Sequence, residues 1–178
     1  MLDAMTAWPG AMGRTILVSP DGPQDARLFP GGREWYSITN ITEAAVERSA
    51  AVRASLRTWF EQCLERLDVD ASRAVAIGFS QGAIVGHALL APRPLVGRGA
   101  FVGCPVSTLS EEAVLPAAYL VGDRDRFVDH VRLAADLAER ELQYRLELFA
   151  GMSHEVGPPA VAALWRDQIL SRTNPHPT

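Results

Sequence analysis

The sequence contains no lysine, and all 17 of its basic residues are arginine in a chain of 178 residues. The formal net charge is −4, and no clustered basic face is visible, so nucleic acid is not an expected partner. No apolar run approaches the ~20 residues that a membrane helix needs, so we expect no stable membrane insertion. Missing lysine and abundant alanine are typical of GC-rich coding, which favours a bacterial source.

Cysteine is also scarce. Cys63 and Cys104 are the only two in the chain, and neither has a neighbour at metal-ligand spacing. We therefore expect buried thiols in a reducing cytoplasm and no metal site. Residues 1–5 do not begin a basic segment followed by an apolar one, which argues against a secretion signal. The predicted location is cytoplasmic.

The length predicts a single domain over residues 1–172, with a disordered tail at 173–178. Apolar, strand-like segments alternate with segments of helical periodicity. The expected strands are 14–19, 73–77, 99–103, 117–121 and 143–149. The expected helices are 42–67, 81–90, 128–142 and 158–171, and a loop rich in glycine and proline is expected near 20–40. This alternation predicts an α/β fold, a mainly parallel sheet with helices on both faces.

Residues 78–82, Gly-Phe-Ser-Gln-Gly, lie between an expected strand and an expected helix. This context predicts a sharp turn with Ser80 at its apex, in a sparsely populated backbone conformation. We expect a Cβ at Gly78 or Gly82 to crowd the crossing of strand and helix. The serine hydroxyl would then be exposed above a helix N-terminus, whose dipole favours developing negative charge. A chance match is less expected because acid and histidine candidates follow in order.

A serine hydroxyl needs a base to become a nucleophile. His154 is the preferred base because it lies in a glycine-containing loop between the last strand and the last helix. His87 lies within the helix after Ser80 and is expected to be packed or partly exposed. His130 opens a helix and His176 lies in the tail.

The acid that orients the base is expected just after the strand at 117–121. Asp125 is preferred because its loop can carry the carboxylate towards the histidine. Asp123 would be a surface or hydrogen-bonding residue and Asp129 a helix-start carboxylate, while Glu155 is a poor orienter because it adjoins the histidine. The aspartates also suggest calcium, but interleaved arginines and the absence of a loop glycine and distal glutamate argue against it.

Ser80, Asp125 and His154 follow three strands in that order, so all three are expected at one rim of the sheet. Together they predict a nucleophile, an orienting acid and a base. The backbone N–H of Gln81 is the expected donor to a tetrahedral oxyanion, and a second donor is expected from a loop after an earlier strand.

These motifs resemble the carboxylesterase, lysophospholipase and acyl-protein thioesterase family of α/β-hydrolases. The resemblance rests on 78–82, on 18–23 with 31–36, on 122–128 and on 151–154, and it runs from about residue 2 to residue 171. It implies a serine hydrolase that cleaves carboxylic esters or thioesters through an acyl-enzyme, with a small-molecule substrate and no cofactor. It supports Asp125 over Asp123 and implies that Trp35 lines the acyl pocket. A homodimer is compatible with it, and the connection at 104–116 is too short for a lid domain.

The resemblance also predicts an N-terminally shortened fold. Residues 2–12 resemble the helix that follows the family's His-Gly loop, and that loop carries the second oxyanion donor. A misassigned start codon, a truncated form or a real loss would each explain this. Losing one donor costs roughly 3 kcal/mol of transition-state stabilisation. The alternative function is therefore a catalytically impaired hydrolase-like binding protein or a fragment; an upstream-extended chain would melt higher and turn over faster.

A nucleotide-binding sheet is a third hypothesis, supported only by the glycines of residues 97–103. Their spacing differs from the dinucleotide fingerprint, and they precede a strand instead of following one. We therefore discount it.

Overall fold

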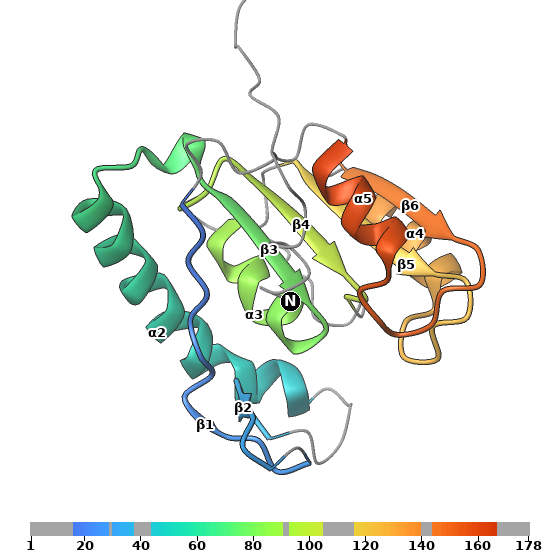
Figure 1. Cartoon of the computed structure of the whole chain (residues 1–178), viewed down its shortest axis with the longest axis horizontal. Coiled ribbons are helices and arrows are strands. Elements are labelled where there is room, and N and C mark those ends of the chain that lie inside the picture. Colours follow the sequence, from blue (N-terminus) through green and yellow to red (C-terminus); the bar gives the residue numbers. More distant parts are fainter. Residues whose placement is uncertain are drawn as a thin grey trace, which may run out of the picture.

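The computed structural model (Figure 1) describes most of the chain. The described residues are 16–28, 30–37, 44–90, 93–104, 116–139 and 144–166. The expected helix at 2–12 and the expected tail at 173–178 lie outside these ranges, so both stay predictions. None of the described helices is both long and apolar enough to cross a membrane.

Four parallel strands form the main sheet, in the order β3–β4–β5–β6. They are β3 (Val75–Phe79), β4 (Arg98–Val102), β5 (Ala117–Gly122) and β6 (Tyr144–Phe149). Phe79 pairs with Val102, and Gly122 pairs with Phe149, so the carboxyl ends of neighbouring strands are aligned. The parallel α/β architecture expected from the sequence is confirmed, and the loops that follow these strands share one edge of the sheet.

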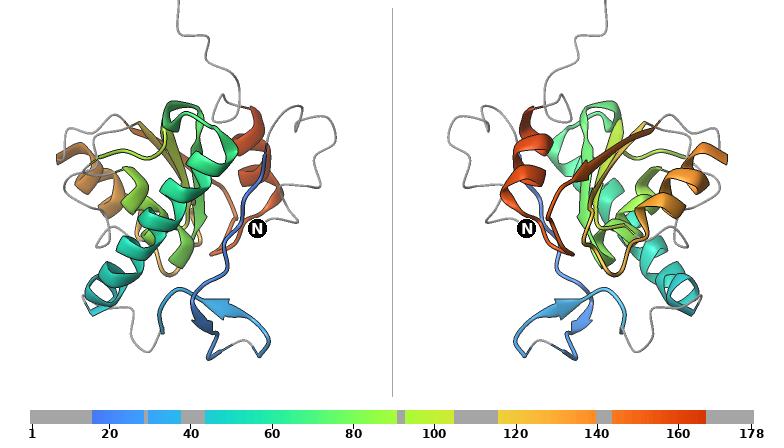
Figure 2. Two further views of the ribbon diagram at one scale, coloured as in Figure 1. Left: turned by 90° about the vertical axis from the view of Figure 1, so that its left-hand side faces the viewer. Right: turned by 90° about the vertical axis from the view of Figure 1, so that its right-hand side faces the viewer.

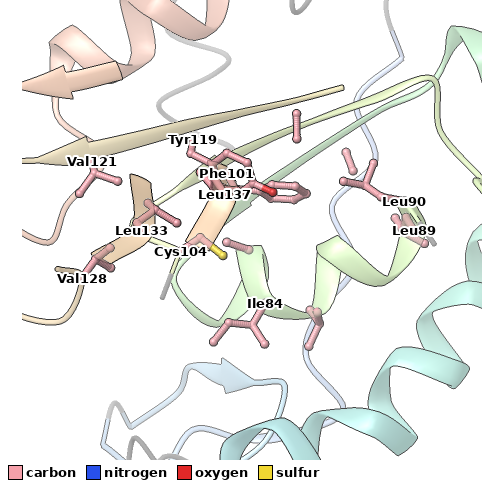
Figure 3. Packing of buried hydrophobic residues seen from close by; sticks show 14 of the residues in the cluster. Ile84, Leu89, Leu90, Phe101, Cys104, Tyr119, Val121, Val128, Leu133 and Leu137 are labelled. Atoms are coloured by element: carbon pink, nitrogen blue, oxygen red, sulfur yellow. The ribbon is translucent and has the colours of Figure 1, made fainter. Parts of the chain in front are cut away.

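Helices cover both faces of this sheet (Figure 2). The helices α2 (Ala44–Leu67), α3 (Gln81–Gly86) and α4 (His130–Glu139) lie on one face, and α5 (Pro158–Arg166) lies on the other. Alternation along the strands divides the core in the same way, because successive side chains point to opposite faces. Phe101 and Tyr119 pack with Leu133 and Leu137 of α4 on the first face (Figure 3).

The opposite face has smaller side chains. Ala100 and Val102 of β4 pack with Ala160 and Ala163 of α5. Val75, Ile77 and Phe79 of β3 are only partly buried against this cluster.

Local hydrogen bonds shift several predicted boundaries. Residues 71–73 form a short 3-10 turn, η1 (Ala71–Arg73), because Asp70 accepts the backbone N–H of Ser72, so β3 begins at Val75 instead of residue 73. The helix expected from 128 begins at His130, because the carboxylate of Asp129 accepts the N–H groups of Val131 and Arg132 at its first turn.

Two expectations near the N-terminus need correction. The strand at 14–19 is wrong over its described part, since residues 16–19 join no ladder among the described residues; Ile16 and Val18 are 59% and 46% exposed. The loop at 20–40 contains a small antiparallel pair, β1 (Gln24–Asp25) and β2 (Arg33–Glu34). Strands of two residues are too short to show an alternating pattern.

The remaining elements follow the predictions closely. The segment 81–90 is helical but divides into α3 and a 3-10 turn, η2 (His87–Leu90). Cys104 is buried as expected, whereas Cys63 is only half-buried on α2. Neither cysteine is part of a disulfide.

Candidate active site

Ser80 occupies a strained turn between β3 and α3. Its φ of 51° and ψ of −119° lie in a region that L-residues rarely adopt, at a cost of about 1–3 kcal/mol. The backbone N–H of Ser80 donates to the carbonyl of Val102 at 3.0 Å, which fixes the turn to β4. A Cβ added at Gly78 would lie 2.5 Å from the Cα of Ala83, so this glycine is required where strand and helix cross.

Gly82 differs from the expectation. A Cβ there would meet only the Nε1 of Trp35, at 3.9 Å, so it would not crowd the crossing of β3 and α3. The prediction was wrong at this position because the missing Cβ points towards Trp35 and away from β3. Gly82 therefore leaves room beside the indole.

His154 contacts both other members of the predicted triad. Its Nε2 lies 2.9 Å from the Oγ of Ser80, and its Nδ1 lies 2.8 Å from the Oδ2 of Asp125. The two ring nitrogens therefore face different partners, one on the loop after β3 and one on the loop after β5. With a proton on Nδ1, the ring donates to the carboxylate and can accept the serine proton at Nε2.

Asp125 is held by its own loop. Its side chain is 1% exposed, and its Oδ1 accepts the backbone N–H groups of Phe127 at 2.8 Å and Val128 at 3.1 Å. Oδ2 remains for His154. A buried carboxylate is costly unless it is hydrogen-bonded, and here both oxygens have partners.

The three aspartates of this region bind separate partners. The carboxylate of Asp123 accepts the N–H of Gly151 at 2.7 Å, in the loop that carries His154. Asp129 caps α4, and its pKa is lowered mainly by the hydrogen bond from the backbone of Arg132. The hydrogen-bonding role expected for Asp123 and the helix-start role expected for Asp129 are confirmed.

The acid loop and the histidine loop are joined by main-chain contacts. The N–H of Asp123 donates to the carbonyl of Phe149 at 3.1 Å, and the N–H of Arg124 donates to that of Met152 at 3.1 Å. A Cβ at Gly122 would overlap the carbonyl oxygen of Met152. This close approach requires glycine at the end of β5.

Three residues beside His154 were not singled out from the sequence. Gly103, with φ +56°, sits so close that an added Cβ would lie 3.0 Å from Cε1 and 3.1 Å from Nδ1 of the imidazole. The rings of Phe79 and Phe127 lie 5.0 Å and 4.8 Å from the imidazole, centroid to centroid. Gly103 was visible only as part of a discounted nucleotide motif, and no periodic signal marks either phenylalanine.

The side chain of Gln81 joins the serine turn to the aromatic segment before α2. Its Oε1 accepts the backbone N–H of Trp35 at 3.1 Å, and its Nε2 donates to the carbonyl of Tyr36. We refer to this pair of hydrogen bonds as the Gln81 clamp. It holds Trp35 beside the first turn of α3.

Trp35 also lines a cavity of about 400 Å³ between the N-terminal segment and α2. Pro20, Val52, Leu56 and Trp59 are among its other lining residues. Ser80 and His154 are not among them. The structure thus places Trp35 between the serine turn and an apolar cavity.

The other histidines lie elsewhere. His87 is fully buried on η2, where its Nε2 lies 2.7 Å from the hydroxyl of Tyr119. This agrees with the packed position expected for it. His130 opens α4, and His176 lies outside the described residues.

The comparisons with known proteins agree with the fold. A family model described as phospholipase/carboxylesterase matches residues 2–161. The structure resembles esterase PE8, with a TM-score of 0.70 and 17% identity over 82% of this chain and 74% of that one. For a SOBER1 variant from Arabidopsis thaliana, the TM-score is 0.70 and the identity is 16%, over 96% of this chain and 91% of that one. For a carboxylesterase from Mesorhizobium loti, the TM-score is 0.66 and the identity is 14%, over 81% of this chain and 70% of that one. At these identities the structural likeness shows a shared fold.

Proposed function

The chain belongs to the phospholipase/carboxylesterase family, and on this premise we propose that it is a serine hydrolase that cleaves carboxylic esters or thioesters through an acyl-enzyme on Ser80. One observation carries the proposal. The imidazole of His154 lies 2.9 Å from the Ser80 hydroxyl and 2.8 Å from the Asp125 carboxylate, each through a different nitrogen.

In the first step, Ser80 Oγ attacks the acyl carbon while His154 Nε2 takes the hydroxyl proton. The carbonyl oxygen becomes an oxyanion, to which the backbone N–H of Gln81 donates. This N–H is suited to the role because the first N–H groups of a helix have no acceptor within the helix. Backbone donors of this kind typically each contribute about 3 kcal/mol.

In the second step, the bond from the acyl carbon to the leaving oxygen or sulfur breaks, and His154 returns its proton to the leaving group. Water then attacks the acyl-enzyme with His154 again as base, which releases the acid and restores Ser80. Asp125 keeps the Nδ1–H tautomer throughout and stabilises the imidazolium. No cofactor takes part in either step.

The substrate is a small-molecule ester or thioester whose acyl part lies beside Trp35. Two features support this placement. The Gln81 clamp ties Trp35 to the residue that follows the nucleophile, and the indole also lines an apolar cavity. Apolar walls of this kind are typical of ligand sites. We place the enzyme in the cytoplasm.

A fluorophosphonate probe tests the proposal. We expect the parent protein to gain the mass of one phosphonyl group, and Ser80→Ala to gain none. Hydrolysis of p-nitrophenyl acetate should show an acyl-enzyme burst in the parent only. An adduct that persists in Ser80→Ala would rule out Ser80.

The alternative, an impaired hydrolase-like binding protein, gives a different result. A folded parent chain that shows neither labelling nor a burst would favour it. Thermal melting of parent and Ser80→Ala provides the control, since removing one hydroxyl should leave the fold intact.

A further inference from the structure

Phe127 is a large apolar side chain left on the surface beside the predicted base. It is 54% exposed, although a buried phenylalanine would typically contribute about 1.5–3 kcal/mol more to folding. Its ring centroid lies 4.8 Å from that of His154, with an interplanar angle of 60°. This is a typical geometry for a contact between two aromatic rings.

The position of Phe127 is fixed by its backbone. Its N–H donates to Asp125 Oδ1 at 2.8 Å, and the next N–H, of Val128, donates to the same oxygen at 3.1 Å. Val128 points into the core at 2% exposure. Phe127 therefore stands outward at the rim, on the loop that also carries Asp125.

The proposed reaction brings the leaving group to the same place. When the tetrahedral intermediate collapses, the acyl C–O bond breaks and His154 Nε2 gives its proton to the leaving oxygen. That oxygen must lie within about 2.6–3.2 Å of Nε2. The first carbons of the alcohol are bonded to it, so they lie close to the imidazole, whose ring centroid is 4.8 Å from that of Phe127.

We propose that Phe127 is a specificity-determining residue that selects esters with an apolar, preferably aromatic, alcohol part. This inference rests on the proposed function and specifies the alcohol part of the substrate, which becomes the leaving group. The exposed ring face of Phe127 contacts the alcohol part, while Trp35 serves the acyl part. Phe79, the other ring at His154, is partly buried against the α5 face of the sheet and is less accessible.

Two acetate esters test the inference, benzyl acetate and methyl acetate, because they share the acyl group and differ in the alcohol. The readout is the ratio of their kcat/KM values in the full chain. The ratio should favour benzyl acetate in the parent and fall about fivefold to tenfold in Phe127→Ala, the range expected for a lost ring–ring contact. The ratio in Phe127→Leu should lie between those of the parent and Phe127→Ala, because leucine keeps an apolar side chain without a ring.

Tyr144→Ala is the matched control. Tyr144 is also an exposed aromatic residue, 37% exposed, but it begins β6 and so lies at the opposite end of the sheet from the rim. Its removal should leave the ratio and both rates unchanged. Thermal melting of all variants shows whether they are folded.

An unchanged ratio in Phe127→Ala would overturn the inference, even if both rates fell together, because equal losses mean that the ring only orients His154. In that case phosphonate labelling of Ser80 and turnover of methyl acetate still support the proposed function. A folded parent that is not labelled and hydrolyses neither ester would contradict the proposed function, and the inference with it.

Discussion

The rim of the sheet and the segment before α2 are held in different ways. At the rim, main-chain hydrogen bonds fix each loop to its neighbour: Ser80 N–H to Val102 O at 3.0 Å, and Gly103 N–H to Leu120 O at 3.0 Å. Among its described residues, the segment that carries Trp35 has two strands of two residues each. It is joined to the rim by the side chain of Gln81, and Tyr36 anchors it in the apolar core. The groups proposed for chemistry are thus fixed by backbone hydrogen bonds, whereas the proposed acyl wall is held by the side chain of Gln81 and by apolar packing. Substrate preference can therefore change without moving the chemistry.

The largest expected effect comes from Asp125→Asn. The asparagine oxygen can still accept the two loop N–H groups, so the fold should remain. Its NH2 group would face His154 and favour the wrong tautomer, and kcat should fall by about four orders of magnitude. Steady-state hydrolysis of p-nitrophenyl acetate measures this change.

Asp123→Asn is the matched control, because its oxygen can still accept the N–H of Gly151 and it does not face the imidazole. We expect little change in kcat. If Asp123→Asn were the more damaging change, the assignment of the acid would be wrong.

Gly103→Ala should have the next largest effect. The added methyl group would meet the imidazole at 3.0–3.1 Å and push His154 away from Ser80, which should lower kcat by about ten- to a hundredfold. Gly31→Ala separates this from backbone strain, since Gly31 also has a positive φ, of 81°, but open space around it. Both variants should lose about 1–2 kcal/mol of stability, and equal kcat values in the two would refute a steric role for Gly103.

Gln81→Met should act on substrate binding more than on chemistry. It removes both hydrogen bonds of the Gln81 clamp, each typically contributing about 0.5–1.5 kcal/mol, but keeps the backbone N–H proposed for the oxyanion. We expect KM for a long-chain ester to rise about three- to tenfold, with a much smaller change in kcat. Gln62→Met, at an exposed position on α2, is the control; a fall in kcat without a change in KM would contradict this role.

The smallest effect concerns Asp129, at the start of α4. Its pKa is lowered by hydrogen bonds from the helix backbone, led by that of Arg132. A lowered folded-state pKa means that the stabilisation is present above the ordinary aspartate pKa and is lost as pH falls through the folded value. The melting temperature of Asp129→Ala should therefore lie below that of the parent at pH 7, and the gap should shrink below about pH 4. A gap that stays constant down to pH 2 would contradict the ionic contribution.

The alternation of strand-like and helical segments along the sequence predicted most of the fold. Three strands of the main sheet are short, mostly apolar runs and β6 alternates, and parallel pairing brings the ends of these segments to one edge, which places Ser80, Asp125 and His154 together. The order of the three residues along the chain therefore predicted their proximity. Their catalytic roles remain a prediction that the labelling experiment tests.

The contacts around this core were not predictable in the same way. The approach of Gly103 to His154 depends on a positive φ and on two loops that are far apart in sequence. The Gln81 clamp joins residues 46 positions apart through side-chain and backbone atoms. Residues 16–19 of the expected strand are not a strand, because a strand exists only with a hydrogen-bonded neighbour and an apolar pattern does not reveal that neighbour.

The contacts between the acid loop and the histidine loop set a rule for protein engineering. Gly122 touches the carbonyl of Met152, and Asp123 accepts the N–H of Gly151, so the two loops form one mechanical unit. Grafting either loop alone from a relative would replace one partner of these contacts and leave the other unmatched. A transplant of this rim has to exchange both loops together.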